Sequence, residues 1–196
     1  MKQSAEKMTY SDYLTWPEGE RWELISGVAY NMSPAPSPMH QHVLGELFAQ
    51  LHALSANSRC SVYLVPFDVR FPEKNEKETD ISTVVQPDIS IVCDASKIDR
   101  KGCKGAPDMV IEILSPATAK KDRREKFRLY QRHQVKSYWI VSPLDEIIEV
   151  FTLNQDGKYG EADIYTADDR VPVSVFPGAE IDLAKVFSVN REEEEE

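Results

Sequence analysis

Two acidic side chains in apolar surroundings are the first candidates for chemistry in this sequence. Glu112 stands within residues 110–114, which otherwise have the composition of a buried strand, and Asp88 follows Pro87 at the head of a second apolar run. A buried carboxylate is costly unless something neutralises it. If the two strands are neighbours, the carboxylates can meet, and a divalent cation between them would relieve their repulsion. Mg²⁺ commonly takes one or two carboxylates, so we predict that Asp88 and Glu112 bind Mg²⁺ or Mn²⁺.

Asp108 is a competing acid, because it also follows a proline. It lies four residues before Glu112 on the same expected strand, which is roughly 13 Å at about 3.3 Å per residue. That span is too long for a shared ion with bonds of about 2.1 Å, so we expect Asp108 at the entrance of the strand. The alternative for Asp88 is an exposed acid in a turn.

A basic segment follows the Glu112 strand and supplies the opposite charge. Residues 117–136 hold eight Lys or Arg against two acids, a local net charge of +6. At 100° per residue along a helix, Asp122, Lys126 and Tyr130 fall on the side marked as inward by Leu129. A lysine that faces the core needs an anionic partner, which predicts that Lys126 points at the site. The alternative is an i,i+4 pair with Asp122 whose amine reaches solvent.

The opposite side of this helix carries a basic stripe. We predict that it contacts nucleic-acid phosphates, with a solvated helix face as the alternative. The net charge of −10 does not exclude a polyanion, because residues 192–196 contribute five negative charges and removing them leaves −5. The stripe residues expected to contact DNA phosphates are Lys120, Lys121, Arg124 and Arg128.

The elements that must position these side chains follow from local patterns. Apolar residues at helical spacing predict helices, alternation predicts strands, and Ser26-Gly27 and Asp156-Gly157 mark hairpins. We see no repeat and no linker, so one α/β domain is expected. The predicted helices cover residues 8–16, 40–54, 118–134 and 179–187, and the predicted strands cover residues 61–71, 84–93, 107–114, 137–143 and 147–154.

The composition is that of an ordinary soluble protein, with 41% hydrophobic and 29% charged residues. Its apolar runs are too short for a membrane span, and the first residues lack a signal-peptide core. Cys60, Cys93 and Cys103 show no CxxC spacing, so neither a disulfide framework nor a zinc site is expected. We therefore expect a cytoplasmic protein without membrane association.

Several stretches together resemble a known family. Pro87-Asp88 followed by Glu112 resembles the restriction-endonuclease-like superfamily with the PD-(D/E)xK motif, although Leu114 stands where that motif has its lysine. A closer resemblance is to the Uma family of restriction endonucleases, and it covers residues 8–187. The stretches that carry it are "WELISG", "SPMHQHVLGELF", "VPFDVRF", "VQPDISIVCD", "GAPDMVIEILSP", "KKDRREKFRLY" and "YWIVSP".

The resemblance implies a restriction-endonuclease-like α/β fold, with a central mixed β-sheet flanked by helices and an N-terminal β-hairpin addition. It implies metal-dependent cleavage of DNA, with the missing lysine moved to Lys126. It also places Glu23 and His40 near the site; the alternatives are a cross-strand partner within the hairpin for Glu23 and a helix-cap histidine for His40. Asp122 and Tyr130, on the inward side of the helix, are expected to support the site. The single domain is then residues 8–187, followed by a disordered acidic tail over residues 188–196.

Two rival functions remain open at this point. The first is a nucleic-acid-binding or oligomerisation module that keeps the fold without catalysis, and the second is a phosphoesterase for small nucleotides. Because duplex cleavage needs two active sites or two visits, we also expect a homodimer. The apolar side chains proposed for its interface are Trp16, Phe151 and Phe176.

Overall fold

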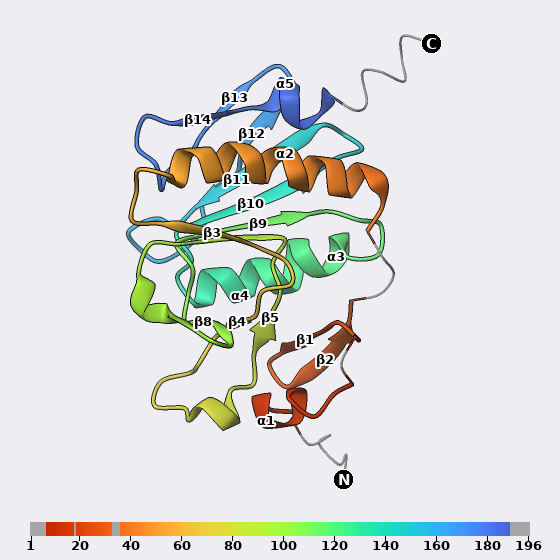
Figure 1. The fold of residues 1–196 in the computed structure, drawn as a ribbon, viewed down its shortest axis with the longest axis vertical. Coiled ribbons are helices and arrows are strands. Elements are labelled where there is room, and N and C mark those ends of the chain that lie inside the picture. The colour runs from red at the N-terminus through yellow and green to blue at the C-terminus, as the bar shows by residue number, and fades with distance from the viewer. Residues whose placement is uncertain (1–6, 18, 33–35, 189–196) are drawn as a thin grey trace.

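A central mixed sheet organises the computed structural model, which describes residues 7–17, 19–32 and 36–188 (Figure 1). Within these residues the sheet has six strands in the order β12-β11-β10-β9-β6-β3, and only the β9–β10 pair is parallel. The strands are β3 (Ser61–Leu64), β6 (Ile89–Val92), β9 (Met109–Ile113), β10 (Ser137–Ser142), β11 (Ile147–Thr152) and β12 (Asp163–Thr166). The predicted central mixed sheet is confirmed, and the two strands expected to be neighbours, β6 after Asp88 and β9 with Glu112, pair in this sheet.

Helices cover both faces of this sheet (Figure 1). Helix α2 (Pro38–Ser55) begins at Ser37, whose hydroxyl accepts a bond from the His40 amide, and its Leu47 packs with Ile111 of β9. On the opposite face, Leu129 and Tyr130 of α4 (Phe127–Arg132) pack with alternate strand residues such as Val110. Ile111 thus faces α2 and Val110 faces α4. Because side chains alternate along a strand, Glu112 lies on the same face as Val110, toward α4.

The helix after β9 contains an irregular turn. It runs as α3 (Ala119–Lys121), a π-helical turn (Asp122–Lys126) and α4, where the sequence predicts one regular helix. A π turn has i→i+5 hydrogen bonds and holds more residues per turn, so it rotates the preceding side chains relative to those that follow. This rotation affects Lys121, as described below.

A second sheet, which the sequence did not predict, packs beside the α4 face. Within the described residues its order is β2-β1-β5-β4-β8-β7. Each predicted strand over residues 61–71 and 84–93 is in fact two strands in different sheets, because Pro66 and Pro87 lack the amide hydrogen that a continuous ladder needs. The predicted hairpin at Ser26-Gly27 is confirmed as one end of this sheet. The strands are β1 (Trp22–Ile25), β2 (Val28–Asn31), β4 (Val69–Arg70), β5 (Val84–Val85), β7 (Ile98–Asp99) and β8 (Gly102–Lys104).

Short elements complete the fold. The closing segment over residues 179–187 begins as a strand before its helical turn, so the helix predicted there is only partly correct. The predicted acidic tail lies outside the described residues apart from Ser188, whose hydroxyl lies 3.2 Å from His42 Nε2. The remaining elements are α1 (Tyr10–Tyr13), three 3₁₀ residues (Glu78–Asp80) and three more (Ala95–Lys97), β13 (Arg170–Pro172), β14 (Glu180–Asp182) and α5 (Leu183–Val186).

Cys60 and Cys93 form a disulfide, so the expectation of none was wrong. Cys60 precedes β3 and Cys93 follows β6, and the antiparallel Ser61–Val92 pairing carries the two Cα atoms to 3.8 Å. Their 33-residue separation hides this proximity in the sequence. Cys103 is a free, buried cysteine.

The aromatic side chains proposed for a dimer interface are packed within the chain. Phe176 is buried, Phe151 makes an edge contact with Phe127, and Trp16 packs against its neighbours. The exposed large apolar side chains among the described residues are instead Met8, Leu14, Val28, Leu144 and Ile164. Across residues 7–17, 19–32 and 36–188, no helix has the length and apolarity required to cross a membrane.

Candidate active site

Glu112 is neutralised by the helix that follows its strand. The side chain is buried, and its Oε1 accepts hydrogen bonds from Lys126 Nζ at 2.8 Å and from the Tyr130 hydroxyl at 2.5 Å. Lys126 ends the π turn and Tyr130 lies one turn further along α4, so both donors reach Glu112 from one helix face. The inward orientation predicted for Lys126 is confirmed.

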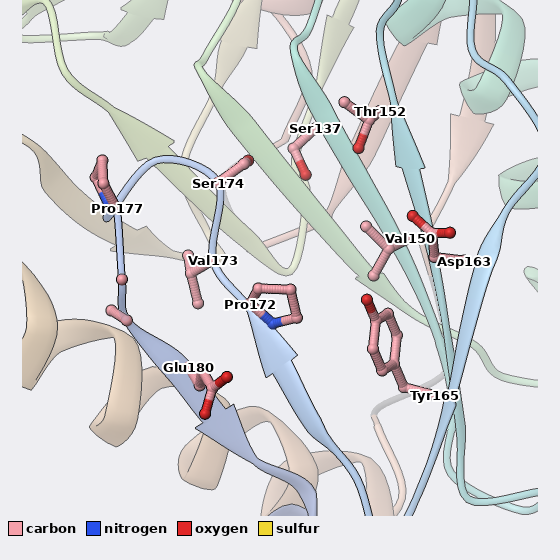
Figure 2. A pocket seen from close by; sticks show the side chains of 12 residues that line it. Ser137, Val150, Thr152, Asp163, Tyr165, Pro172, Val173, Ser174, Pro177 and Glu180 are labelled. Carbon is pink, nitrogen blue, oxygen red and sulfur yellow. The ribbon is translucent and has the colours of Figure 1, made fainter.

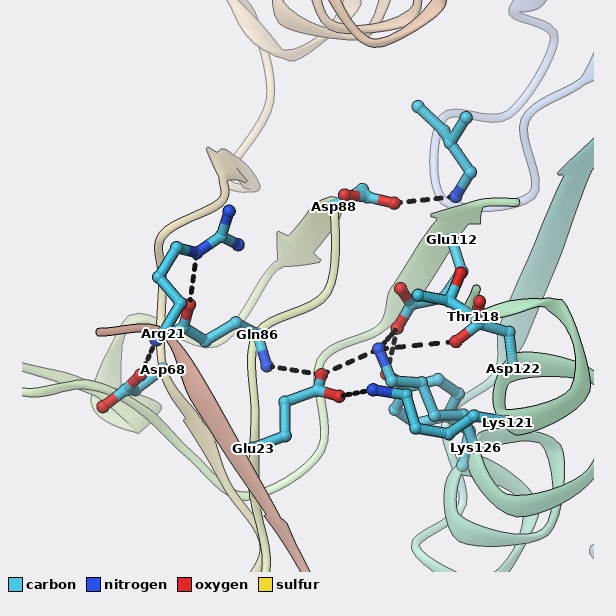
Figure 3. A network of polar contacts seen from close by, with 12 residues as sticks. Arg21, Glu23, Asp68, Gln86, Asp88, Glu112, Thr118, Lys121, Asp122 and Lys126 are labelled. Atoms are coloured by element: carbon cyan, nitrogen blue, oxygen red, sulfur yellow. Dashed lines mark hydrogen bonds and ion pairs between the residues drawn. The ribbon is translucent and has the colours of Figure 1, made fainter. Parts of the chain in front are cut away.

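Lys126 also contacts two further acids, one on β1 and one on its own π turn (Figure 3). Its Nζ lies 2.8 Å from Glu23 Oε1 on β1 and 3.7 Å from Asp122 Oδ1 on the π turn. Because Lys126 is only 2% exposed, the alternative in which its amine reaches solvent is wrong. Glu23 and Asp122 are buried as well, so the ammonium lies among three carboxylates.

Lys121 was predicted on the outer stripe, and that placement is wrong. Its Nζ lies 2.5 Å from Glu23 Oε2, and its side chain is only 14% exposed. In a regular helix, residues 121 and 126 would not share a face, but the i→i+5 geometry of the π turn aligns them. Two lysines therefore meet the two oxygens of Glu23. The other stripe residues, Lys120, Arg124 and Arg128, are exposed as expected.

Asp88 reaches the same end of the sheet from β6. Continuing the register Ile89–Ile111 by one residue sets Asp88 opposite Glu112. Asp88 Oδ2 accepts a hydrogen bond from the Ile113 amide at 2.8 Å and lies 3.4 Å from His40 Nε2. The Asp88 side chain is 15% exposed, so it is not an exposed turn acid.

Asp108 lies apart from these groups, as expected. Its carboxylate accepts hydrogen bonds from the Cys93 amide at 2.8 Å and from Lys136 Nζ at 2.7 Å. These contacts hold Asp108 at the opposite end of β9 from Glu112.

The charged groups line a cavity of about 740 Å³. Arg21 and Gln86 also contribute to its wall. Its rim is apolar and comes from the start of α2 and from the loops after β9 and β10. The charged lining residues at its base are Asp88, Glu112, Lys121, Asp122 and Lys126, and the apolar rim residues include Met32, Pro38, Met39, Pro116, Pro143 and Leu144.

A smaller cavity of about 270 Å³ lies between β11, β12 and the β13–β14 turn (Figure 2). Its described lining includes Asp163 and Glu180 but no lysine, arginine or histidine. Tyr165 and Pro172 make much of its wall apolar. We therefore assign the chemistry to the larger cavity.

The acids beside the larger cavity interact strongly with one another and with the lysines. Burial raises the pKa of Glu112 to about 8; Lys126 lowers it, whereas Asp122, Asp88 and Glu23 raise it. Burial also raises the pKa of Asp122. For Lys126, burial acts to lower the pKa, but the surrounding carboxylates outweigh it and raise the pKa well above its usual value. Three acids of the lining and the fully buried Glu23 therefore surround Lys121 and Lys126, and Arg21 adds a third cation to the cavity wall.

This donor set fits a hard divalent cation. Asp122 Oδ1 is buried without a hydrogen-bond partner, and the acids offer the oxygen ligands that Mg²⁺ prefers. Among the described residues, however, no three His, Cys, Asp or Glu side chains are arranged to hold a metal by themselves. A cation there would need water or substrate oxygens as additional ligands, which is usual for Mg²⁺.

The raised pKa of Glu112 predicts how stability depends on pH. The carboxyl titrates near 4.5 in the unfolded chain and near 8 in the metal-free folded chain. Between these two pH values the folded chain keeps a proton on Glu112 that the unfolded chain has lost. The stability that Glu112 contributes is therefore fully present below pH 4.5 and is lost as the pH rises toward 8. Glu112→Gln should remove this contribution. Urea denaturation at about pH 5 and pH 8.5 measures the free energy of unfolding of both proteins. The difference, variant minus wild type, should be more positive at the higher pH by more than about 1 kcal/mol. An unchanged difference would contradict the raised pKa.

Comparisons with known proteins agree with this architecture. A family model for Uma2, described as "Putative restriction endonuclease", matches residues 10–184. "Uncharacterized protein slr1290" of Synechocystis is 30% identical in a 172-residue alignment that covers 84% of this chain and 84% of that protein. A crystal structure from Anabaena variabilis, titled as a putative nuclease belonging to DUF820, has a TM-score of 0.72 at 22% identity and covers 92% of this chain and 98% of its own. The structural likeness confirms the expected fold class.

Proposed function

Because this chain belongs to the Uma2 family described as "Putative restriction endonuclease", we propose that it is a divalent-metal-dependent endonuclease that hydrolyses DNA phosphodiester bonds. The observation that carries the proposal is the buried Glu112–Lys126 pair, which faces the same cavity as Asp88. A purely structural ion pair gains nothing from a cavity, whereas a substrate site requires one.

Asp88 and Glu112 are the residues that would hold Mg²⁺ or Mn²⁺. The chemistry that such a cation supplies when bound is Lewis-acid activation of a phosphodiester and of water. The chain prepares the two acids for this role: the Ile113 amide and His40 orient Asp88, and Lys126 and Tyr130 orient Glu112. Lys126 in addition places a fixed positive charge beside the position of the reacting phosphate, where negative charge develops.

The surface of the same helix supports binding of the substrate. Lys120, Arg124 and Arg128 are exposed, and such residues bind DNA phosphates in a salt-dependent way without reading the sequence. We retain the homodimer as part of the proposal, because cleavage of both strands needs two sites or two visits. The measured mass in solution tests it.

Nicking of supercoiled plasmid tests the proposed function. We expect the purified protein to convert plasmid to the open circular form with Mn²⁺ or Mg²⁺ and to stop when EDTA is added. Asp88→Asn should be inactive, since it removes a metal ligand, whereas Asp108→Asn should retain activity, because Asp108 lies outside the cavity.

The same assay separates the rival functions. Binding of plasmid without cleavage in any metal would favour a non-catalytic module, and hydrolysis confined to mononucleotides would favour a phosphoesterase. Cleavage that persists in EDTA, or in Asp88→Asn, would contradict the assignment of Asp88 as a metal ligand.

A further inference from the structure

The two lysines of the cavity differ in how many hydrogen-bond donors they have already used. A lysine ammonium has three N–H donors. Lys126 directs two of them to Glu23 and Glu112, and Asp122 stands 3.7 Å from the same nitrogen. Asp122 is too far away for a hydrogen bond, so one donor of Lys126 remains. Because three acids surround the ammonium and the side chain is only 2% exposed, another anion has little access to it.

Lys121 is differently placed. Its one hydrogen bond to a described residue is to Glu23 Oε2, which leaves two donors for another partner. Its side chain is 14% exposed, against 2% for Lys126, and it lines the cavity. Its Nζ also lies 5.6 Å from the centre of the Tyr30 ring, so Glu23 and Tyr30 hold the ammonium in place.

We propose that Lys121 is the lysine that contacts the phosphate of the substrate in this cavity, with its free N–H groups donating to a non-bridging oxygen. Lys126, which the buried acids enclose, contributes its charge beside the phosphate without donating to it. This inference rests on the proposed function, because it assumes that the ligand of the cavity is a phosphate ester.

The π turn gives the arrangement its physical basis. It aligns Lys121 with Lys126 on Glu23, so that one carboxylate positions both ammonium groups. The phosphate brings negative charge to a cavity that is already lined by three acids, Asp88, Glu112 and Asp122. A lysine with unused donors at the cavity wall offsets that repulsion.

Two measurements on Lys121→Ala, Lys121→Arg and Lys185→Ala test the assignment. The first is calorimetric binding of inorganic phosphate in the presence of Mn²⁺, and the second is Mn²⁺-dependent hydrolysis of bis(p-nitrophenyl) phosphate, which needs no DNA sequence. Lys185 is the control, because it is an exposed lysine of the short helix α5, which packs on the α2 side of the sheet away from the cavity.

We expect Lys121→Ala to weaken phosphate binding at least about tenfold and to reduce kcat about 10²-fold. Lys121→Arg should restore a large part of both, because arginine keeps the charge and its donors. Lys185→Ala should change either value by no more than about twofold, since exposed charges away from the cavity contribute little.

The outcomes separate this inference from the proposed function. Lys121-dependent phosphate binding without any metal-dependent hydrolysis would support Lys121 and refute the nuclease. Hydrolysis at the wild-type rate by Lys121→Ala would refute Lys121 and leave the nuclease standing. Absence of phosphate binding by wild type at millimolar concentration would also overturn the assignment of Lys121. Should Lys121→Ala fail to fold, wild-type values in Lys121→Arg would support the assignment, and loss of phosphate binding in this charged, folded variant would overturn it.

Discussion

Glu112→Gln is expected to abolish Mn²⁺ binding and to lower the rate of plasmid nicking by on the order of 10³. Glutamine has the same shape but lacks the charge of a carboxylate, so a metal site that contains Glu112 loses its principal buried ligand. The fold should survive. The metal-free protein already holds a proton on this carboxyl near neutral pH, because its pKa is about 8, and the neutral amide imitates that state.

Isothermal calorimetry provides a direct check of the Glu112 prediction. Wild type should release close to one proton per Mn²⁺ bound near pH 7, since the cation displaces the proton of Glu112. The release is read from the dependence of the binding heat on the ionisation enthalpy of the buffer. Asp108→Asn is the control and should bind Mn²⁺ as wild type does. Undiminished Mn²⁺ binding by Glu112→Gln would contradict the assignment of Glu112 as a metal ligand.

Lys126→Ala is expected to cause a large loss of both activity and stability. The variant leaves Glu23, Glu112 and Asp122 buried without the ammonium that they share. Removal of one partner from a buried ion pair typically costs about 3–5 kcal/mol of stability. The rate of nicking should fall by on the order of 10² to 10³, because a positioned charge beside the phosphate is lost.

The dependence of this stability loss on pH distinguishes an electrostatic cause from lost packing. At about pH 5 the abandoned carboxyl groups can take up protons, so the loss should be smaller than at about pH 8. Urea denaturation at both values measures it. Lys136→Ala is the control, because Lys136 pairs with Asp108 at 2.7 Å but is 72% exposed, and such pairs contribute roughly 0–1 kcal/mol. Equal losses at both pH values would indicate that Lys126 stabilises the fold through packing alone.

A loss of nicking in Lys126→Ala without any loss of stability would also be informative. It would mean that the three acids are already protonated when Lys126 is absent, and that the lysine contributes only to chemistry. Comparison with Lys121→Ala then separates the two lysines, since Lys121 has one buried partner and Lys126 has three.

Local patterns in the sequence were sufficient for the central strands and for much of the site. Alternation in β6 and β9 assigns Ile89 and Ile111 to one face of the sheet and Val110 and Glu112 to the other, because successive side chains of a strand point in opposite directions. A charged residue in such a strand requires a partner, and the helical spacing of Lys126 and Tyr130 identifies that partner. These inferences depend on short-range geometry, which the sequence carries.

The tertiary structure decided the features that depend on contacts between distant segments. Glu23 lies on a hairpin 89 residues from Glu112 in the sequence, and only the packing of the second sheet brings it to Lys126. The pairing of β3 with β6 likewise joins Cys60 to Cys93. Burial and cross-strand register arise from the complete chain, so no local pattern contains them.

The orientation of Lys121 depends on both local helix geometry and tertiary contacts. A regular helix of 3.6 residues per turn assigns Lys121 to the exposed stripe, and the sequence contains no residue that marks a π turn. In the folded chain, the turn allows two lysines to reach one buried carboxylate. The sequence by itself determined the acids, the helix and the buried Lys126. The tertiary structure decided that Lys121 joins them, because the ion pairs with Glu23 form only after β1 has packed against the helix.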